Sequence, residues 1–183
     1  GAGNDTITTG GGADSILGGD GNDNVTVFGS GAVTVDGGAG NDIIFGAAAN
    51  SSLSGGADDD SIFGIASVSY TMDGGSGNDS IGGNGDNDVL LGGDGNDRID
   101  GNSGDDTITG GAGADLLTAD EGTDWLLYAG DTAGVTVNLG SVATQAGGQA
   151  EGDLVTGFEA LIGGSGNDTL TGDDAGNTLV GGD

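Results

Sequence analysis

The chain has 183 residues, of which 46 are Gly and 30 are acidic, against one basic residue and no His, Cys or Pro. The net charge of −29 excludes nucleic acid and anionic membrane surfaces as partners, since both need a basic protein surface. Catalysis by His or Cys is excluded, and no stretch approaches the roughly 18 apolar residues of a membrane helix. We therefore expect a non-enzymatic protein that inserts into no membrane and whose natural partner is a cation.

A nine-residue repeat occupies the first part of the chain. Its clearest copies are residues 92–100, 101–109 and 110–118, with Gly at positions one, two and four, Asp at six and an aliphatic residue at eight; Asn102 is the one exception. Glycine permits the positive φ angles of a tight turn, and the Asn common at position five tolerates the left-handed region. The last three residues, one apolar between two outward-facing neighbours, predict a strand of about three residues with one buried face.

The aliphatic position keeps its phase from the first residues to Leu126. Every spacing is nine residues except two of ten, from Val25 to Val35 and from Ile62 to Met72. A Gly-rich flexible linker would not hold such a phase. The predicted strand centres are Ile7, Ile16, Val25, Val35, Ile44, Leu53, Ile62, Met72, Ile81, Leu90, Ile99, Ile108, Leu117 and Leu126.

The rest of the chain departs from the repeat and then returns to it. Residues 134–139 alternate as a strand should, residues 145–153 indicate a loop, and the repeat resumes at 163–171 and 172–180. We predict a repeat block over 1–127, a spacer over 128–160 that forms longer coils of the same solenoid, and resumed repeats over 161–183. A small separate domain is the alternative for the spacer. Since the sequence starts and stops inside a repeat, we expect it to be part of a longer protein.

The repeat resembles the RTX (hemolysin-type) calcium-binding nonapeptide. The resemblance implies an all-β fold, a right-handed parallel β-roll (β-solenoid) in which two nonapeptides make one coil and calcium lies between stacked turns. Turns two repeats apart then share an edge of the roll. The position-six residues of the first edge are Asp5, Asp23, Asp42, Asp60, Asp79, Asp97 and Asp115. The second edge has Asp14, then three turns without Asp (near residues 29–31, at Ser51, and near residues 65–67), then Asp88, Asp106 and Asp124.

The same resemblance implies the calcium ligands. Each ion would lie between the position-six carboxylates of two stacked turns and take backbone carbonyl oxygens as well, because calcium prefers six to eight oxygens. Adjacent Asp pairs on the two edges give about eight ions. Asp14 and Asp168 also stand at position six, although the turn stacked on Asp14 lacks Asp. Without calcium, neighbouring carboxylates about 4.8 Å apart would repel by roughly 3 kcal/mol per pair, so we expect the metal-free roll not to hold.

Two functions are compatible with this reading. The first is a structural calcium-dependent module of a large secreted bacterial surface protein, an S-layer component or adhesin, exported unfolded by type I secretion and able to assemble with copies of itself. It would fold outside the cell, where calcium is plentiful. The alternative is the accessory RTX segment of a secreted enzyme or toxin, such as a protease, lipase, epimerase or cytolysin, whose catalytic domain lies elsewhere.

Overall fold

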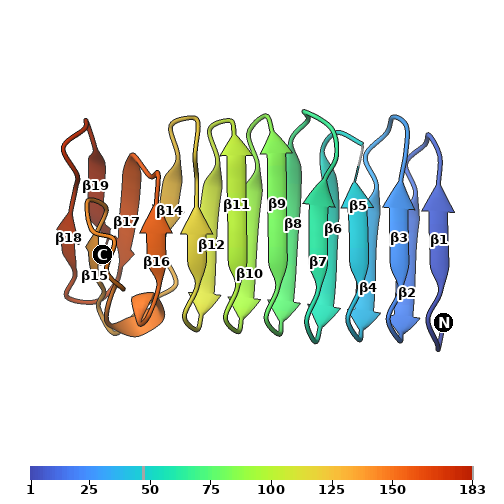
Figure 1. The fold of residues 1–183 in the computed structure, drawn as a ribbon, viewed down its shortest axis with the longest axis horizontal. Coiled ribbons are helices and arrows are strands. Elements are labelled where there is room, and N and C mark those ends of the chain that lie inside the picture. Colours follow the sequence, from blue (N-terminus) through green and yellow to red (C-terminus); the bar gives the residue numbers. More distant parts are fainter. Residues whose placement is uncertain (47, 183) are drawn as a thin grey trace.

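The computed structural model describes residues 1–46 and 48–182 and shows a row of stacked coils running from the N-terminus to the C-terminus (Figure 1). An eight-stranded sheet contains β1 (Thr6–Thr9), β3 (Asn24–Val27), β5 (Ile43–Gly46), β7 (Ser61–Gly64), β9 (Ser80–Gly85), β11 (Arg98–Ser103), β13 (Leu116–Thr118) and β16 (Leu154–Thr156) in that order. A nine-stranded sheet contains β2 (Ser15–Asp20), β4 (Thr34–Ala39), β6 (Ser51–Ala57), β8 (Tyr70–Ser76), β10 (Val89–Asp94), β12 (Thr107–Ala112), β14 (Trp125–Leu127), β17 (Ala160–Gly164) and β19 (Thr178–Gly182). No helix in the described part of the chain is long and apolar enough to cross a membrane.

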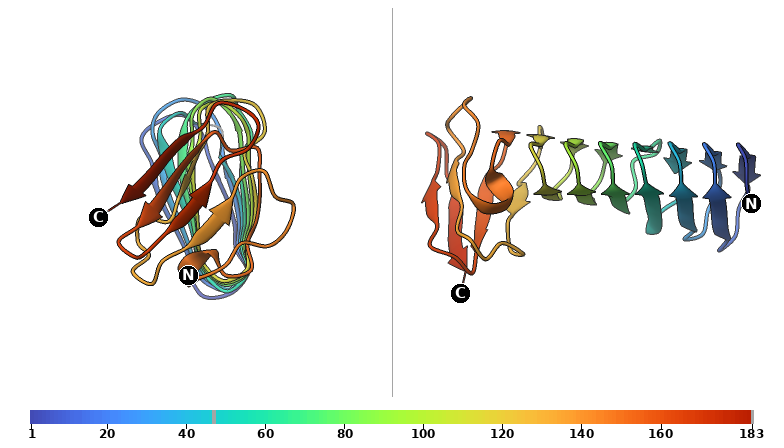
Figure 2. Two further views of the ribbon diagram at one scale, coloured as in Figure 1. Left: turned by 90° about the vertical axis from the view of Figure 1, so that its left-hand side faces the viewer. Right: turned by 90° about the horizontal axis from the view of Figure 1, so that it is seen from below.

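The strands confirm the predicted β-roll. Each strand pairs in parallel with the equivalent strand of the next coil, so that Ile7 lies beside Val25 and Val25 beside Ile44. Consecutive repeats fall in opposite sheets, as predicted: Ile99 belongs to β11 and Ile108 to β12. Figure 2 shows the two sheets as flat layers facing each other.

The core is the narrow space between these two layers. Of the fourteen predicted strand centres, all but Ile7 are buried, and Ile7 is partly buried because it belongs to the first coil and has a neighbour on one side only. Burying each such side chain stabilises the fold by about 1.5–3 kcal/mol. One stack of aliphatic residues therefore holds the coils together.

The predicted strand length was wrong. All strands up to β12 have four to seven residues, not about three, because pairing continues into the turn, as between Gly93 and Gly111. The position-five Asn residues do not take positive φ angles; Gly93 (φ 114°) and Gly95 (φ 139°) do so at positions two and four. The Asn side chain instead accepts a hydrogen bond from the next coil, as from Asn22 N to Asn4 Oδ1 at 3.0 Å.

The spacer leaves the coil after β14 and comes back to it. It contains β15 (Thr136–Asn138) and a short 3₁₀ helix, η1 (Gly148–Ala150), before β16 joins β13 and β17 joins β14. β15 pairs with β18 (Thr169–Thr171) in a separate two-stranded sheet, and this end of the molecule widens away from the roll (Figure 2).

Candidate metal sites at the two edges

The seven Asp residues of the first edge form one continuous column. The backbone N–H of each Asp donates a hydrogen bond to Oδ1 of the Asp on the next coil, with N–O distances of 2.7–2.9 Å from the Asp5–Asp23 contact through Asp97–Asp115. The side chains from Asp23 to Asp115 are only 1–2% exposed. Every pair expected from the sequence is thus brought together, with carboxylates held against the backbone of the preceding coil.

The second carboxylate oxygen, Oδ2, has no hydrogen-bond partner in nine buried Asp residues of the described chain. They are Asp23, Asp42, Asp60, Asp79, Asp88, Asp97, Asp106, Asp115 and Asp124. Each of these buried anions would cost several kcal/mol without a compensating partner. Buried carboxylate oxygens that lack a partner in turn after turn indicate where a cation could bind.

A glycine leaves room beside these oxygens. A Cβ on Gly74, at position one, would collide with Asp79 Oδ2 of its own turn and with the carbonyl oxygen of Gly92 on the next coil. Gly37 and Gly92 stand in the same relation to their neighbours. Carboxylate and carbonyl oxygens therefore converge where a side chain would stand, and these are the donors that calcium prefers.

No group of three carboxylates is assembled within residues 1–46 and 48–182. The sites differ in this respect from metal centres built only of acidic side chains. Two stacked carboxylates with backbone carbonyls are the donor set that the geometry offers, and the residues present fit calcium.

Asp88, Asp106 and Asp124 repeat this arrangement on the second edge. Asp88 N donates to Asp106 Oδ1 at 2.8 Å, and Asp106 N to Asp124 Oδ1 at 2.7 Å. The column therefore covers only the later coils of this edge.

The sequence matches the RTX calcium-binding nonapeptide repeat over residues 1–26, 29–53, 36–64, 71–99, 91–126 and 155–183, which is well over half of the chain. The chain belongs to the RTX calcium-binding repeat family. No curated protein and no solved structure matches it.

Burial perturbs the acidity of the RTX carboxylates. It raises the pKa of Asp60 and of Asp88 to about 7, and the pKa values of Asp79, Asp97, Asp106 and Asp115 to about 6. The negative charges of neighbouring Asp residues raise these pKa values further, whereas the backbone hydrogen bonds lower them. In the absence of a cation, the columns therefore hold protons more tightly than free carboxylates do.

The early part of the second edge lacks the RTX carboxylate and is filled differently. Val33, Ser51 and Tyr70 occupy the position-six place; Ser51 Oγ accepts a hydrogen bond from Val33 N at 3.0 Å. The Tyr70 ring lies inside the turn, 2% exposed, and its hydroxyl donates to the Gly46 carbonyl at 2.8 Å. An aromatic ring and neutral hydrogen bonds thus occupy turns that carry Asp elsewhere.

Two predicted site residues are not brought beside a second carboxylate. Asp14 accepts a hydrogen bond from the Thr9 hydroxyl. Asp168 accepts from Val135 N at 2.9 Å and from Gly164 N at 3.0 Å, so both of its oxygens have partners. Neither has the paired arrangement of the RTX columns.

Two residues of the spacer accept the hydrogen bond that a position-six Asp accepts within the repeat, and they were not identified from the sequence. Asp115 N donates to Asp153 Oδ1 at 2.9 Å, and Asp124 N donates to Glu159 Oε2 at 2.9 Å. A weak signal exists: each acid stands two residues before a buried aliphatic residue, Val155 or Leu161, as in the RTX repeat.

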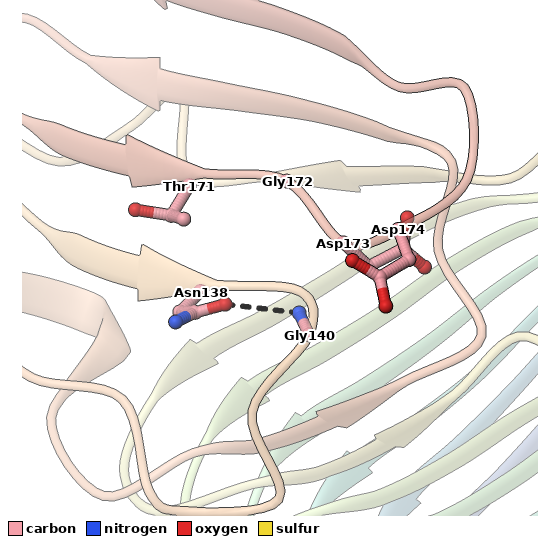
Figure 3. A pocket seen from close by; sticks show the side chains of 6 residues that line it. All are labelled: Asn138, Gly140, Thr171, Gly172, Asp173 and Asp174. Atoms are coloured by element: carbon pink, nitrogen blue, oxygen red, sulfur yellow. Dashed lines mark hydrogen bonds between the residues drawn. The ribbon is translucent and has the colours of Figure 1, made fainter.

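Figure 3 shows an acidic pocket at the C-terminal end of the roll, where Asp173 and Asp174 face the turn that follows Asn138. These three side chains are exposed, and Asn138 Oδ1 accepts a hydrogen bond from Gly140 N at 3.0 Å. In the same repeat, Asn177 replaces the position-six Asp. This pocket does not have the burial of the RTX columns.

Proposed function

We propose that this chain is a non-catalytic, calcium-dependent structural module of a larger secreted surface protein of the S-layer or adhesin type. The observation that carries the proposal is the set of buried Asp residues whose Oδ2 atoms have no partner. Those oxygens need a cation before the coils can stack, and membership of the RTX calcium-binding family gives that cation its identity.

The proposed ligands are the stacked Asp pairs. On the first edge these run from Asp5–Asp23 to Asp97–Asp115, and on the second edge they are Asp88–Asp106 and Asp106–Asp124. This gives about eight calcium ions per chain, one for each pair in the stack. Bound calcium would neutralise the column and cross-link successive coils.

Calcium dependence supports a function outside the cell. A chain of charge −29 would remain unfolded in a cytosol poor in calcium and would fold where calcium is near 10⁻³ M, a concentration that suits extracellular modules with Kd of about 10⁻⁴–10⁻³ M. Export of an unfolded chain followed by folding outside is consistent with this difference. Rolls whose columns hold calcium would repel one another less and could then pack against copies of themselves.

Calcium titration followed by circular dichroism tests the proposal. The β signal should be absent in excess EDTA and appear cooperatively as calcium is added, with magnesium at equal concentration as the control, because Mg²⁺ demands octahedral geometry and dehydrates reluctantly. An unchanged β signal in EDTA would refute calcium-dependent folding. Electron microscopy at saturating calcium tests the surface role separately: lattices or filaments support it, and a monodisperse monomer favours the accessory segment of a secreted enzyme or toxin.

A further inference from the structure

The strand that brings the spacer back to the roll, β16, is flanked by two carboxylates. Asp153 precedes it and Glu159 follows it, one at each edge. Each accepts the hydrogen bond that a repeat Asp would accept, from Asp115 N and from Asp124 N, respectively. The two ends of the same strand therefore extend the two carboxylate columns by one coil.

On the first edge the last acid of the column, Asp153, is satisfied without a cation, although Oδ2 of Asp115 before it has no partner. The Tyr128 hydroxyl donates to Asp153 Oδ2 at 2.8 Å, and both residues are at most 1% exposed. With Asp115 N on Oδ1, both oxygens of Asp153 have partners. Tyr128 thus supplies a hydroxyl proton where the earlier Asp residues have an unpartnered oxygen.

On the second edge the column remains open. Asp124 is fully buried, and its Oδ2 has no partner. Glu159 is partly buried beside it and accepts the Asp124 N–H through Oε2. Burial raises the pKa of Asp124, and the negative charge of Glu159 raises this pKa further. Two carboxylates thus meet at this point as they do within the repeat.

A shorter turn explains why Glu stands here in place of Asp. Buried Val155 of β16 and Leu161 of β17 are six residues apart, whereas the corresponding aliphatic residues of the repeat are nine or ten residues apart. Gly157 has φ 84°, and a Cβ there would approach Asp120 N to 2.9 Å, so the turn lies tightly on the preceding coil. The buried Phe158 anchors it, and the additional methylene of Glu lets the carboxylate reach Asp124 from this shorter turn.

We propose that Asp124 and Glu159 hold a further calcium ion, which fastens the spacer to the repeat block. The inference rests on the calcium-binding columns proposed above. β14 begins directly after Asp124 and β17 directly after Glu159, and these two strands pair with each other. An ion shared by the two carboxylates would therefore fix the first residues of both strands, although they are far apart in sequence.

The count of bound calcium ions in Glu159→Gln tests this site. Gln keeps an oxygen that can accept the Asp124 N–H but removes the negative charge. At saturating calcium, native mass spectrometry should find one ion fewer than in the parent chain. Terbium luminescence excited through the only Trp, Trp125, should also weaken, because Trp125 follows Asp124 and pairs with Ala160. An unchanged count with unchanged emission would overturn the proposal.

Two further variants sharpen the test. Asp124→Asn should lose two ions, since Asp124 would be shared by Asp106 and Glu159; a loss of one would overturn the proposal even if Glu159→Gln failed to fold. Asp153→Asn is the matched control at the other end of β16 and should keep the full count, because the Tyr128 hydroxyl already satisfies Oδ2 of Asp153. A parent chain that bound no calcium would instead refute the proposed function.

Discussion

The two edges of the roll hold the same coils together by different means. On the first edge an Asp stands in every turn of the repeat block and is buried from Asp23 to Asp115, whereas on the second edge three consecutive turns carry Val33, Ser51 and Tyr70. The strands that follow these three turns still pair in register, with Val35 beside Leu53 and Leu53 beside Met72. Stacking of coils therefore requires the aliphatic core but does not require a carboxylate at both edges.

The difference shows which group creates the need for metal. Tyr70 is buried with its hydroxyl bonded, while Asp60 on the opposite edge is buried with one oxygen unpartnered. The proposed calcium dependence therefore comes from the carboxylate columns and not from the β-roll as such. The following changes test this separation, from the largest expected effect to the smallest.

Protonation should partly replace calcium. The pKa of Asp is 3.8 in the unfolded chain, but burial raises it to about 7 for Asp60 and to about 6 for Asp79 in the fold. The stability that comes from holding these protons is fully present below pH 3.8 and is lost as the pH rises through 6 to 7. In EDTA, circular dichroism should therefore show more β structure at about pH 5 than at about pH 8. Because the protonated columns are already stabilised without metal, the calcium midpoint for folding should rise over the same rise in pH, and a midpoint independent of pH would contradict the raised pKa values.

Asp60→Ala should raise the calcium midpoint far more than Asp5→Ala. Asp60 is 2% exposed, contacts Asp42 and Asp79, and follows a strained turn residue, Asp58, with φ 76°. Asp5 is half exposed and stacks on a single other Asp, Asp23. Because coil stability depends on nearest neighbours, we expect a shift of about tenfold or more for Asp60→Ala and of about twofold or less for Asp5→Ala. Equal midpoints would mean that the first edge is not a continuous column.

Gly74→Ala should be harmful and Gly10→Ala harmless, although both glycines lie in a turn that leads to a position-six Asp. The new Cβ at Gly74 would enter the space shared by Asp79 Oδ2 and the Gly92 carbonyl, whereas nothing lies within 4 Å of a Cβ at Gly10. Overpacking should cost about 1–3 kcal/mol at Gly74, and the effect at Gly10 should stay within about 0.5 kcal/mol. Urea unfolding at fixed calcium measures both, and equal losses would show that the space beside Asp79 is not special.

Tyr70→Phe should reduce stability by about 1 kcal/mol, because it removes the hydrogen bond to the Gly46 carbonyl and keeps the ring. The same urea unfolding at saturating calcium measures this loss. The number of bound calcium ions should not change, since Tyr70 stands where no carboxylate pair exists. A changed ion count would place a metal site in the gap and contradict the contrast between the edges.

The repeat block was predictable because its glycine, Asp and aliphatic positions all recur with the same spacing. Ile99, Ile108 and their equivalents define strand, sheet and register by a fixed spacing, and the two ten-residue spacings occur in the early turns of the second edge, as the phase indicates. The role of Tyr70 could not be predicted, because it depends on a ring filling a turn that only the stacked coils create. Asp153 and Glu159 were missed because the chain before each of them departs from the nine-residue spacing, by a long excursion before Asp153 and by a spacing of only six residues from Val155 to Leu161 around Glu159.

The hydrogen bonds along each column all run in the same direction, and this limits where the chain can be truncated without losing stability. Every donor N–H belongs to the earlier coil and every acceptor carboxylate to the later one, so the last coil of a fragment always ends with a buried amide that lacks its acceptor. Here the acceptors for Asp115 and Asp124 are Asp153 and Glu159, which lie beyond the repeat block. The smallest stable fragment is therefore longer than its recognisable repeats: a truncation after Leu127 should melt at a lower temperature than one after Gly163.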